Sequence, residues 1–449
     1  MKSEVPEFTK QRPPKHMKES NQCETGRRGV KNLESYWNYT INRIKKLEKK
    51  HIVLVLVFLL TPVLAGIVIS LVSSTSLLQY DAYNTKWNDE TSYNITIREI
   101  REFGTPQNVR SYNEVEPKRL GYGVYRVTTY IPYLVASFFT GISSHNYFVY
   151  CNLFLVTIAN IFFIWAVQPE PKRLIWLIAF NIINIPVYRY IWSGMAEGSH
   201  ISMAIVMTAC GLFLLLGNRG TNRQGNEDTK KGIRGRGKER TIFAVSVILP
   251  LFYGTIRGYQ FIYILIPLAY LIIYQQGIKR YIGVAGIFLL LCISVYLYVA
   301  VLPQWISPYF QSETVGSTGQ FKIYLNDIRA GNIGKIIADI IKKNESAFKT
   351  VSTWISSKSW HWVIIVEPLA MIVLLVIYAT IEKKRSIWIF TGSYVAVILF
   401  VIEGVIMMNK IDQVHRYYLG IWLGCIYALI GSAGGQRNRL CAIKYVALV

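Results

Sequence analysis

The sequence predicts an all-α polytopic membrane protein with about ten transmembrane helices and with interfacial helices in two long extracytoplasmic loops. Apolar residues make up 52% of the 449-residue chain. Apolar runs of roughly 18 to 24 residues recur along most of it, which is the length that a helix needs to cross about 30 Å of hydrocarbon. Short connectors rich in Lys and Arg separate these runs, as the positive-inside rule requires of cytoplasmic segments.

The direction of the predicted spans alternates from a cytoplasmic N-terminus. Under this alternation the basic connectors fall on the cytoplasmic side, and adding or removing one span would break the pattern downstream. We therefore expect both termini in the cytoplasm and the protein in the cell membrane. The predicted spans are 51–74, 146–168, 172–191, 198–217, 241–257, 259–275, 281–302, 361–381, 386–407 and 418–433.

Composition and charge restrict the class of protein further. The formal net charge is +23, but the basic residues lie in connectors and in the tail, not on a face of a folded aqueous domain, so no nucleic acid partner is expected. The tail, residues 1–50, holds thirteen Lys and Arg against six acidic residues, and we expect it to be disordered. None of the six cysteines falls in a predicted extracytoplasmic segment, so no structural disulfide is expected.

Three segments of the two long loops have the pattern of helices that lie on a membrane surface. The first begins near residue 88 and ends at Gly104, and apolar residues recur along it at helical spacing. The second, 122–141, is rich in Tyr and contains Pro132, which disfavours a crossing. The third carries an Ile stripe from Ile333 onward. The simplest alternative for all three is a lid that rests on lipid.

An adjacent acidic pair, Asp89 and Glu90, stands at the predicted start of the first interfacial helix. An acidic residue at this position commonly caps the helix, because backbone donors and the helix dipole favour a carboxylate there. A carboxylate held at the outer membrane surface can also take a proton from a hydroxyl that attacks a lipid-linked substrate. The spacing does not show which of the two residues would do so, since neighbouring helical positions point about 100° apart.

This layout resembles the GT-C superfamily of membrane glycosyltransferases, which includes protein mannosyltransferases and lipid A aminoarabinose transferases. The shared features are the Asp89-Glu90 pair early in the first external loop, the aromatic Tyr93, a helix that closes at Glu102-Phe103-Gly104, and a Tyr-rich helix before the second span. The resemblance implies transfer of a sugar from a polyprenyl-phosphate carrier to an extracytoplasmic glycan, lipid or protein, with inversion. It also implies a loop carboxylate as general base, with Asp89 as the base and Glu90 as its neighbour.

Under this resemblance the chain is divided into four parts. The tail 1–50 precedes a transmembrane catalytic module, 51–302, which includes the first extracytoplasmic loop, 75–145. The second extracytoplasmic loop is 303–360, and a C-terminal transmembrane module covers 361–449.

Two arginines at predicted outer helix ends are candidate donor-phosphate ligands, because a guanidinium can contact two phosphate oxygens. Arg416 follows His415 and precedes Tyr417 at the mouth of the last span, and many GT-C members have a similar Arg-aromatic pair there. An anchor that extends to the interface is the alternative. Arg257 lies in a tight outer turn between two spans, where it either contacts phosphate or only caps the preceding helix.

Glu197 and His200 lie at another outer turn and are candidate substrate-binding residues, because ionisable groups at membrane depth are commonly functional. Their segment is rich in Gly and Ser, so a solvated loop is the alternative. No His, Asp or Glu group has the spacing of a metal site, and no cofactor is expected besides the lipid-linked co-substrate. The triplets that begin at Asn94 and Asn344 match the N-glycosylation pattern.

Two other functions stay open from the sequence. A polysaccharide polymerase or ligase would use arginines of a large outer loop, and 303–360 holds Arg329 and six lysines. A lipid or solute transporter would show midplane charges and broken helices in corresponding halves, and the candidate charges cluster instead at the outer rim.

Overall fold

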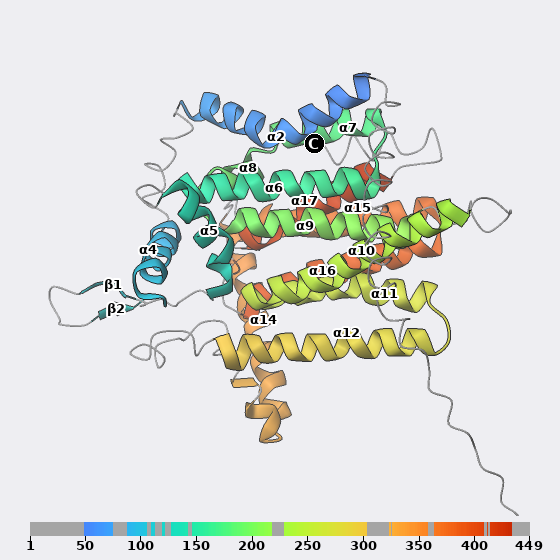
Figure 1. Cartoon of the computed structure of the whole chain (residues 1–449). Coiled ribbons are helices and arrows are strands. Elements are labelled where there is room, and N and C mark those ends of the chain that lie inside the picture. The colour runs from blue at the N-terminus through green and yellow to red at the C-terminus, as the bar shows by residue number, and fades with distance from the viewer. Residues whose placement is uncertain are drawn as a thin grey trace, which may run out of the picture. The chain divides into compact units, whose positions relative to one another are not determined.

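The computed structural model describes most of the chain from the first span onward (Figure 1). The described residues are 49–74, 88–105, 109–112, 119–121, 127–141, 146–217, 229–302, 323–324, 326–357, 363–407, 411 and 414–432. The predicted tail therefore lies almost wholly outside them. The chain divides into two compact units, Met1–Leu56 and Val57–Val449, and all packing described below is within the second.

Helices form nearly all of the described structure. Before the fourth apolar run these are α2 (Lys49–Ser73), α4 (Asn88–Phe103), α5 (Val127–Thr140), α6 (Asn146–Val167), α7 (Pro171–Ile183) and α8 (Ile185–Ile191). They are followed by α9 (Glu197–Gly211) with a π-helical continuation η2 (Leu212–Leu216), α10 (Thr229–Ile256), a 3₁₀ helix η4 (Gly258–Ile264), α11 (Leu265–Tyr274) and α12 (Ile278–Tyr296) with η5 (Leu297–Val301). The last are α14 (Ile333–Ser356), α15 (Val363–Glu382), α16 (Arg385–Met407) and α17 (Val414–Ser432).

The helical membrane class is confirmed. Among the described residues, seven helices are long and apolar enough to cross a membrane, or eight if α7 and α8, which meet at a 72° bend, form one broken span. Two further apolar helices, Gly258–Tyr274 and Tyr417–Gly431, are shorter. Each of the ten predicted spans corresponds to one of these helices, but the count of ten crossings stays a prediction.

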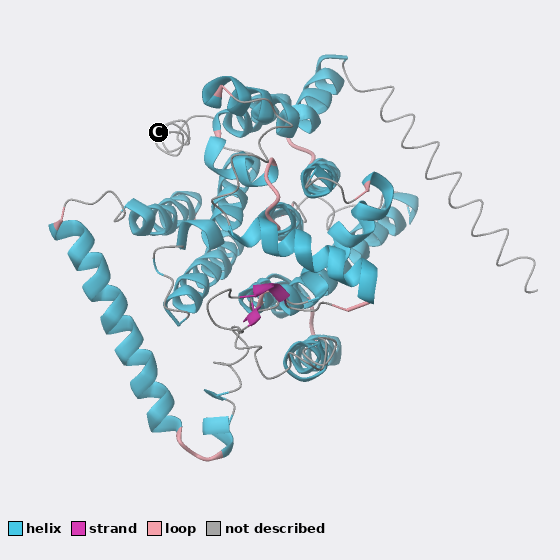
Figure 2. Ribbon diagram, turned by 90° about the vertical axis from the view of Figure 1, so that its left-hand side faces the viewer, coloured by secondary structure: helices cyan, strands magenta, loops and turns pink. Residues whose placement is uncertain are grey.

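No pattern in the sequence predicts the two strands that the described residues contain. Strands β1 (Val109–Tyr112) and β2 (Arg119–Gly121) pair antiparallel within the first long loop. Figure 2 views the molecule from the end at which they lie. The three predicted surface helices are present as α4, α5 and α14, and their placement on a membrane surface stays a prediction.

Helix α9, with its continuation η2, lies at the centre of the bundle and is the most buried of the seven long apolar helices among the described residues. It packs mainly against α6 and α17. Small residues allow the close approach, as they do between membrane helices in general. A Cβ atom added at Gly424 of α17 would lie 2.6 Å from Thr208 Oγ1, and one added at Gly420 would lie 3.3 Å from the His200 carbonyl oxygen.

Buried hydrogen bonds between side chains join other helices of the bundle. The Asn181 amide of α7 donates to the hydroxyls of Tyr427 (2.7 Å) and Thr61 (3.2 Å), and the Tyr427 hydroxyl donates to Asn160 Oδ1 (3.1 Å). Such bonds between membrane helices contribute on the order of 1 kcal/mol each. They fix α6, α7 and α17 in one register with α2.

The break between α7 and α8 has a local cause in the sequence. Pro186 has no backbone N–H to bond the carbonyl four residues earlier, so α7 cannot continue through it; at the start of α8 that missing N–H costs nothing. The side chain of Asn184 then accepts from the backbone N–H of Val187 at 3.4 Å and caps α8. Without this break, α7 and α8 would form one straight span. Instead the helix bends at Asn184, and α8 then leads to the start of α9.

Helix α14 is held against the end of α16 by polar contacts. Lys343 Nζ lies 3.3 Å from Asp339 Oδ2 and donates to the Met407 carbonyl (3.1 Å), and Asn344 donates to Glu403 (3.1 Å). The Tyr324 hydroxyl donates to Asp339, and this bond lowers the pKa of that carboxyl. The Ile side chains of the predicted stripe are largely exposed along another face of α14.

Helices α4 and α5 are bonded to the bundle at the end where α9 and α17 begin and α10 ends (Figure 1). The Tyr147 hydroxyl of α6 donates to Asn94 Oδ1 of α4 (2.6 Å), and the Thr128 hydroxyl of α5 donates to the Thr255 carbonyl of α10 (3.1 Å). Asn94 is buried, so the first glycosylation triplet does not present its amide to solvent in this fold.

Candidate functional site

The segment before α9 is fixed by one buried amide, that of Asn152 in α6. Asn152 Nδ2 lies 2.9 Å from the Met195 carbonyl oxygen, 3.3 Å from that of Ser193 and 3.4 Å from that of Ile191. Asn152 Oδ1 accepts from the Tyr133 hydroxyl of α5 at 2.8 Å. The backbone that enters α9 therefore follows a path set by α6 and α5.

Glu197 occupies the first turn of α9, at the end of this segment. Only 3% of its side chain is exposed. The positive end of a helix dipole favours a carboxylate in a first turn. The alternative of a solvated Gly- and Ser-rich loop is wrong for Glu197 and for His200, which is also buried.

Arg257 stands where α10 ends and the 3₁₀ helix η4 begins. Its backbone N–H donates to the Tyr253 carbonyl (2.8 Å) and closes α10, and its own backbone is extended (φ −137°, ψ 112°). The extended backbone of Arg257 separates α10 from η4, and its side chain reaches Glu197 in the first turn of α9. Arg257 therefore does more than cap α10.

The Arg257 and Glu197 side chains form a largely buried ion pair between α10 and α9. Arg257 Nη2 lies 3.0 Å from Glu197 Oε1, and the side chains are 12% and 3% exposed. A guanidinium is always protonated in proteins, so its charge must be compensated wherever water is excluded. The carboxylate supplies that compensation from the neighbouring helix.

One tyrosine ring contacts the guanidinium, and a second packs against the first. The Arg257 Cζ atom lies 4.8 Å from the centroid of the Tyr417 ring, a cation–π geometry. The Tyr259 ring meets the Tyr417 ring edge-on at 6.0 Å. The first turn of α17 thereby becomes the third wall of the site, and the residue that follows Arg416 is a direct part of it.

His200 and Gln260 close the opposite side. Gln260 Nε2 lies 2.7 Å from His200 Nδ1, and the His200 ring meets the Tyr253 ring edge-on at 6.0 Å. His200 lies one turn after Glu197 in α9, so the two side chains share a helical face.

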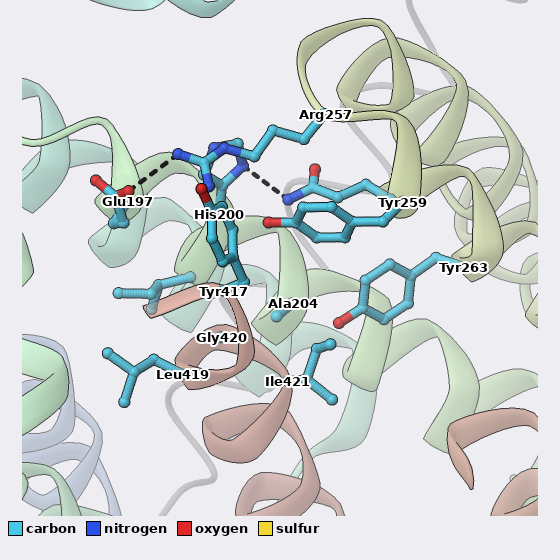
Figure 3. Close-up of a pocket in the computed structure, with 12 residues that line it drawn as sticks. Glu197, His200, Ala204, Arg257, Tyr259, Tyr263, Tyr417, Leu419, Gly420 and Ile421 are labelled. Atoms are coloured by element: carbon cyan, nitrogen blue, oxygen red, sulfur yellow. Dashed lines mark hydrogen bonds and ion pairs between the residues drawn. The ribbon is translucent and has the colours of Figure 1, made fainter. Parts of the chain in front are cut away.

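These side chains line one pocket, shown in Figure 3. Arg257, Tyr259 and Tyr263 extend toward its centre in that view. The lining residues are Glu197, His200, Ile201, Ala204, Arg257, Tyr259, Gln260, Tyr263, Tyr417, Leu419, Gly420 and Ile421.

Three buried polar atoms of the pocket have no hydrogen-bond partner among the described residues: Arg257 Nη1, Gln260 Oε1 and the Tyr263 hydroxyl oxygen. Buried polar groups without a partner are costly, so native proteins usually give each of them a partner or a ligand. The pocket thus presents a cationic N–H, an amide oxygen and a phenol to whatever enters it. This is the pattern of a site for a polar, negatively charged molecule.

Four residues selected from the sequence, Glu197, His200, Arg257 and Tyr417, meet in this pocket. Tyr93 is fully buried in α4, with its ring 5.9 Å from that of Tyr130 of α5, and it is not among the residues that line the pocket.

The acidic pair and the basic pair at the last span have backbone positions but no described side chains. Asp89 and Glu90 fall in the first turn of α4, and His415 and Arg416 in the first turn of α17. Residue 89 precedes Tyr93 by four positions and so shares a helical face with it, about one 5.4 Å turn away. The predicted roles of these four residues stay predictions.

Gln260, Tyr263 and Asn152 were not selected from the sequence. The first two lie in a run, Gly258–Ile264, whose apolar character indicated an ordinary span. A Gln within an apolar run is a usable signal, since membrane helices rarely hold an amide without a partner. Asn152 gives the same signal within α6, but no pattern shows that it binds a distant turn.

No protein-family model matches the chain, and no curated protein and no solved structure matches it. Within the part of the chain that the structure describes, no three His, Cys, Asp or Glu side chains form a group that could hold a metal ion.

Replacing Asn152 by Leu tests whether this amide holds the entrance to α9. The change leaves the carbonyls of the 191–195 segment without their buried donor, and such losses cost roughly 1–3 kcal/mol. We expect faster amide hydrogen exchange across 191–199 in the detergent-solubilised protein. The matched variant Asn344→Leu, in α14, should leave that segment unchanged. Unaltered exchange in Asn152→Leu would show that the segment is held by other contacts.

Proposed function

We propose that this protein is an integral membrane glycosyltransferase that moves a sugar from a polyprenyl-phosphate carrier to an acceptor on the extracytoplasmic side, with inversion. The observation that carries the proposal is the buried Arg257 guanidinium, which directs an unpaired N–H into a tyrosine-walled pocket at the ends of membrane helices. The layout of the first loop, which resembles that of GT-C enzymes, supports it independently.

The guanidinium suits the phosphate of a lipid carrier. It offers rigidly placed donors for phosphate oxygens, and charge-assisted hydrogen bonds of this kind are about twice as strong as neutral ones. The pocket lies at an end shared by three apolar helices, α9, α10 and α17, where a carrier with its chain in lipid can bring its phosphate. When the sugar bond breaks, the leaving phosphate gains charge that Arg257 stabilises.

The other side chains of the pocket suit a sugar. Tyr259 and Tyr417 present aromatic rings, and Gln260 Oε1 and the Tyr263 hydroxyl provide an acceptor and a donor for sugar hydroxyls. Because the polar atoms of Gln260 and Tyr263 are already desolvated, a ligand that satisfies them gains more than it would at an exposed surface.

The acidic pair of α4 supplies the proposed base. In the step, an acceptor hydroxyl oxygen attacks the anomeric carbon and loses its proton to the carboxylate, and the carrier phosphate leaves with the electron pair of the broken bond. The link from α4 to the pocket runs through Tyr93, which shares a helical face with position 89 and packs against Tyr130 of α5, the helix that bonds to Thr255 two residues before Arg257. Asp89 is the first choice by resemblance.

The polymerase or ligase alternative requires arginines of the second long loop at the site of reaction. Arg329 is exposed, and the described lysines of α14 are exposed or, for Lys343, paired with Asp339. No observation favours this alternative over the transferase.

Changing Arg257 to Lys keeps the positive charge and removes the planar pair of N–H donors that can bind two phosphate oxygens. We expect kcat/KM for a polyprenyl-phosphate sugar to fall by roughly 10–100-fold, the value of one lost charge-assisted hydrogen bond. The measurement is transfer in proteoliposomes, with Arg240→Lys, an exposed arginine of the same helix, as the control. Equal activity in both variants would remove Arg257 from the donor site.

Changing Asp89 to Asn removes the proposed base and leaves the shape of the side chain. General bases contribute roughly 10²–10⁴-fold, so we expect kcat to fall by that factor while the protein stays in the membrane. Glu90→Gln is the matched variant and should lose less. Full activity in Asp89→Asn would contradict the role, and a loss confined to Glu90→Gln would assign the base to Glu90.

A further inference from the structure

The ion pair of the pocket has a consequence for how an anion would bind there. Glu197 Oε1 already holds one face of the Arg257 guanidinium at 3.0 Å, with both side chains withdrawn from water. A phosphate that enters the pocket meets the same cation and, close beside it, a carboxylate of its own sign. Attraction and repulsion are therefore built into one site.

We propose that Glu197 is an internal counter-ion that competes with the phosphate group of the ligand for Arg257, and that it keeps the affinity of the pocket for phosphate low. This inference rests on the proposed function only in that the ligand carries a phosphate. Without a ligand, Glu197 compensates the buried charge; with a ligand, the phosphate shares or takes over that task.

The geometry allows both anions to bind one guanidinium. Glu197 uses Nη2, and Nη1 has no partner among the residues that the structure describes. A phosphate on Nη1 would lie a few ångströms from the carboxylate, and charges at such separations interact strongly when water is excluded. Removing or withdrawing the negative charge of Glu197 should therefore strengthen phosphate binding.

Removal of the Glu197 carboxylate should have opposite effects on the stability of the ligand-free protein and on its affinity for phosphate. An arginine left alone in a buried site is strongly destabilising, so removal of Glu197 should lower the melting temperature of the ligand-free protein. Phosphate should restore the lost stability, because a ligand that binds only the folded state stabilises it in proportion to its affinity. A residue that only supports the fold would lower stability without raising affinity.

The fixed position of Glu197 is what makes it a competitor instead of a movable partner. Asn152 pins the backbone that leads into α9, and a Cβ added at Gly198 would lie 2.4 Å from the Asn152 side chain, so the first turn of α9 cannot shift toward α6. The carboxylate therefore cannot move toward α6 with its helix when an anion arrives.

The test compares full-length wild type with Glu197→Gln in nanodiscs, using two probes of the same chemistry, inorganic phosphate and farnesyl phosphate. We expect the Kd of Glu197→Gln for each probe to be roughly tenfold lower than that of wild type, because the repulsion between the Glu197 carboxylate and the phosphate is removed. We also expect a larger rise in melting temperature on adding the probe. A gain for both probes identifies a site for the phosphate group itself, and a gain for farnesyl phosphate alone identifies a site that also requires the lipid chain.

Glu239→Gln is the matched control, because Glu239 lies in the same helix as the Arg257 junction, about 27 Å along α10 by helix geometry, and loses the same charge. Farnesol, which lacks phosphate, should gain nothing. If Glu197→Gln does not fold, Glu197→Asp is used instead. Its carboxylate is withdrawn by one methylene and repels the phosphate less, so at least a twofold gain in affinity for the phosphate probes is expected.

Equal or weaker phosphate binding in the Glu197 variants, or an equal gain in Glu239→Gln, would overturn the inference. These binding measurements are independent of sugar transfer. If the wild-type protein transfers no sugar while Glu197→Gln still gains affinity for phosphate, the proposed function alone is wrong. If the wild-type protein transfers sugar and the gain in affinity is absent, only this inference is wrong.

Discussion

The buried charge of Arg257 is the constraint on which the rest of the site depends. An ion withdrawn from water costs several kcal/mol even after relaxation, and only a well-placed partner offsets that cost. The partner, Glu197, belongs to another helix, so the end of α10 and the start of α9 must keep one register. The extended backbone at Arg257 and the Asn152 clamp at the entrance to α9 are the local devices that maintain it.

The outer helices belong to the same arrangement. Thr128 of α5 bonds to the Thr255 carbonyl, two residues before Arg257, and Tyr133 of the same helix bonds to Asn152, which holds the segment before Glu197. Helix α5 thus contacts the supports of both members of the ion pair. The idea of a lid that only rests on lipid is too simple for α5, because its inner face is bonded to the elements that carry the charges.

Hydropathy and charge alternation predicted the helices well, because crossing a bilayer imposes a length and a composition that are local in sequence. The same patterns indicated Glu197, His200 and Arg257 one at a time, as polar residues at helix ends, and the resemblance to GT-C enzymes indicated Tyr417. Their meeting could not be predicted, since it depends on the packing of α9, α10 and α17, which are distant in sequence. Asn152 and the β1–β2 hairpin were missed because a single amide and two short polar strands leave no periodic signal.

The central proposal is that Arg257 receives the phosphate of a lipid carrier. Cryo-electron microscopy of the protein in nanodiscs with a non-hydrolysable polyprenyl-phosphate sugar tests this most directly. If Arg257 is the donor ligand, phosphate density lies within about 3 Å of its Nη1 atom, a hydrogen-bond distance, with the sugar against the tyrosine rings. Phosphate density at the lysines of α14, with the Arg257–Glu197 pocket closed and empty, would contradict it.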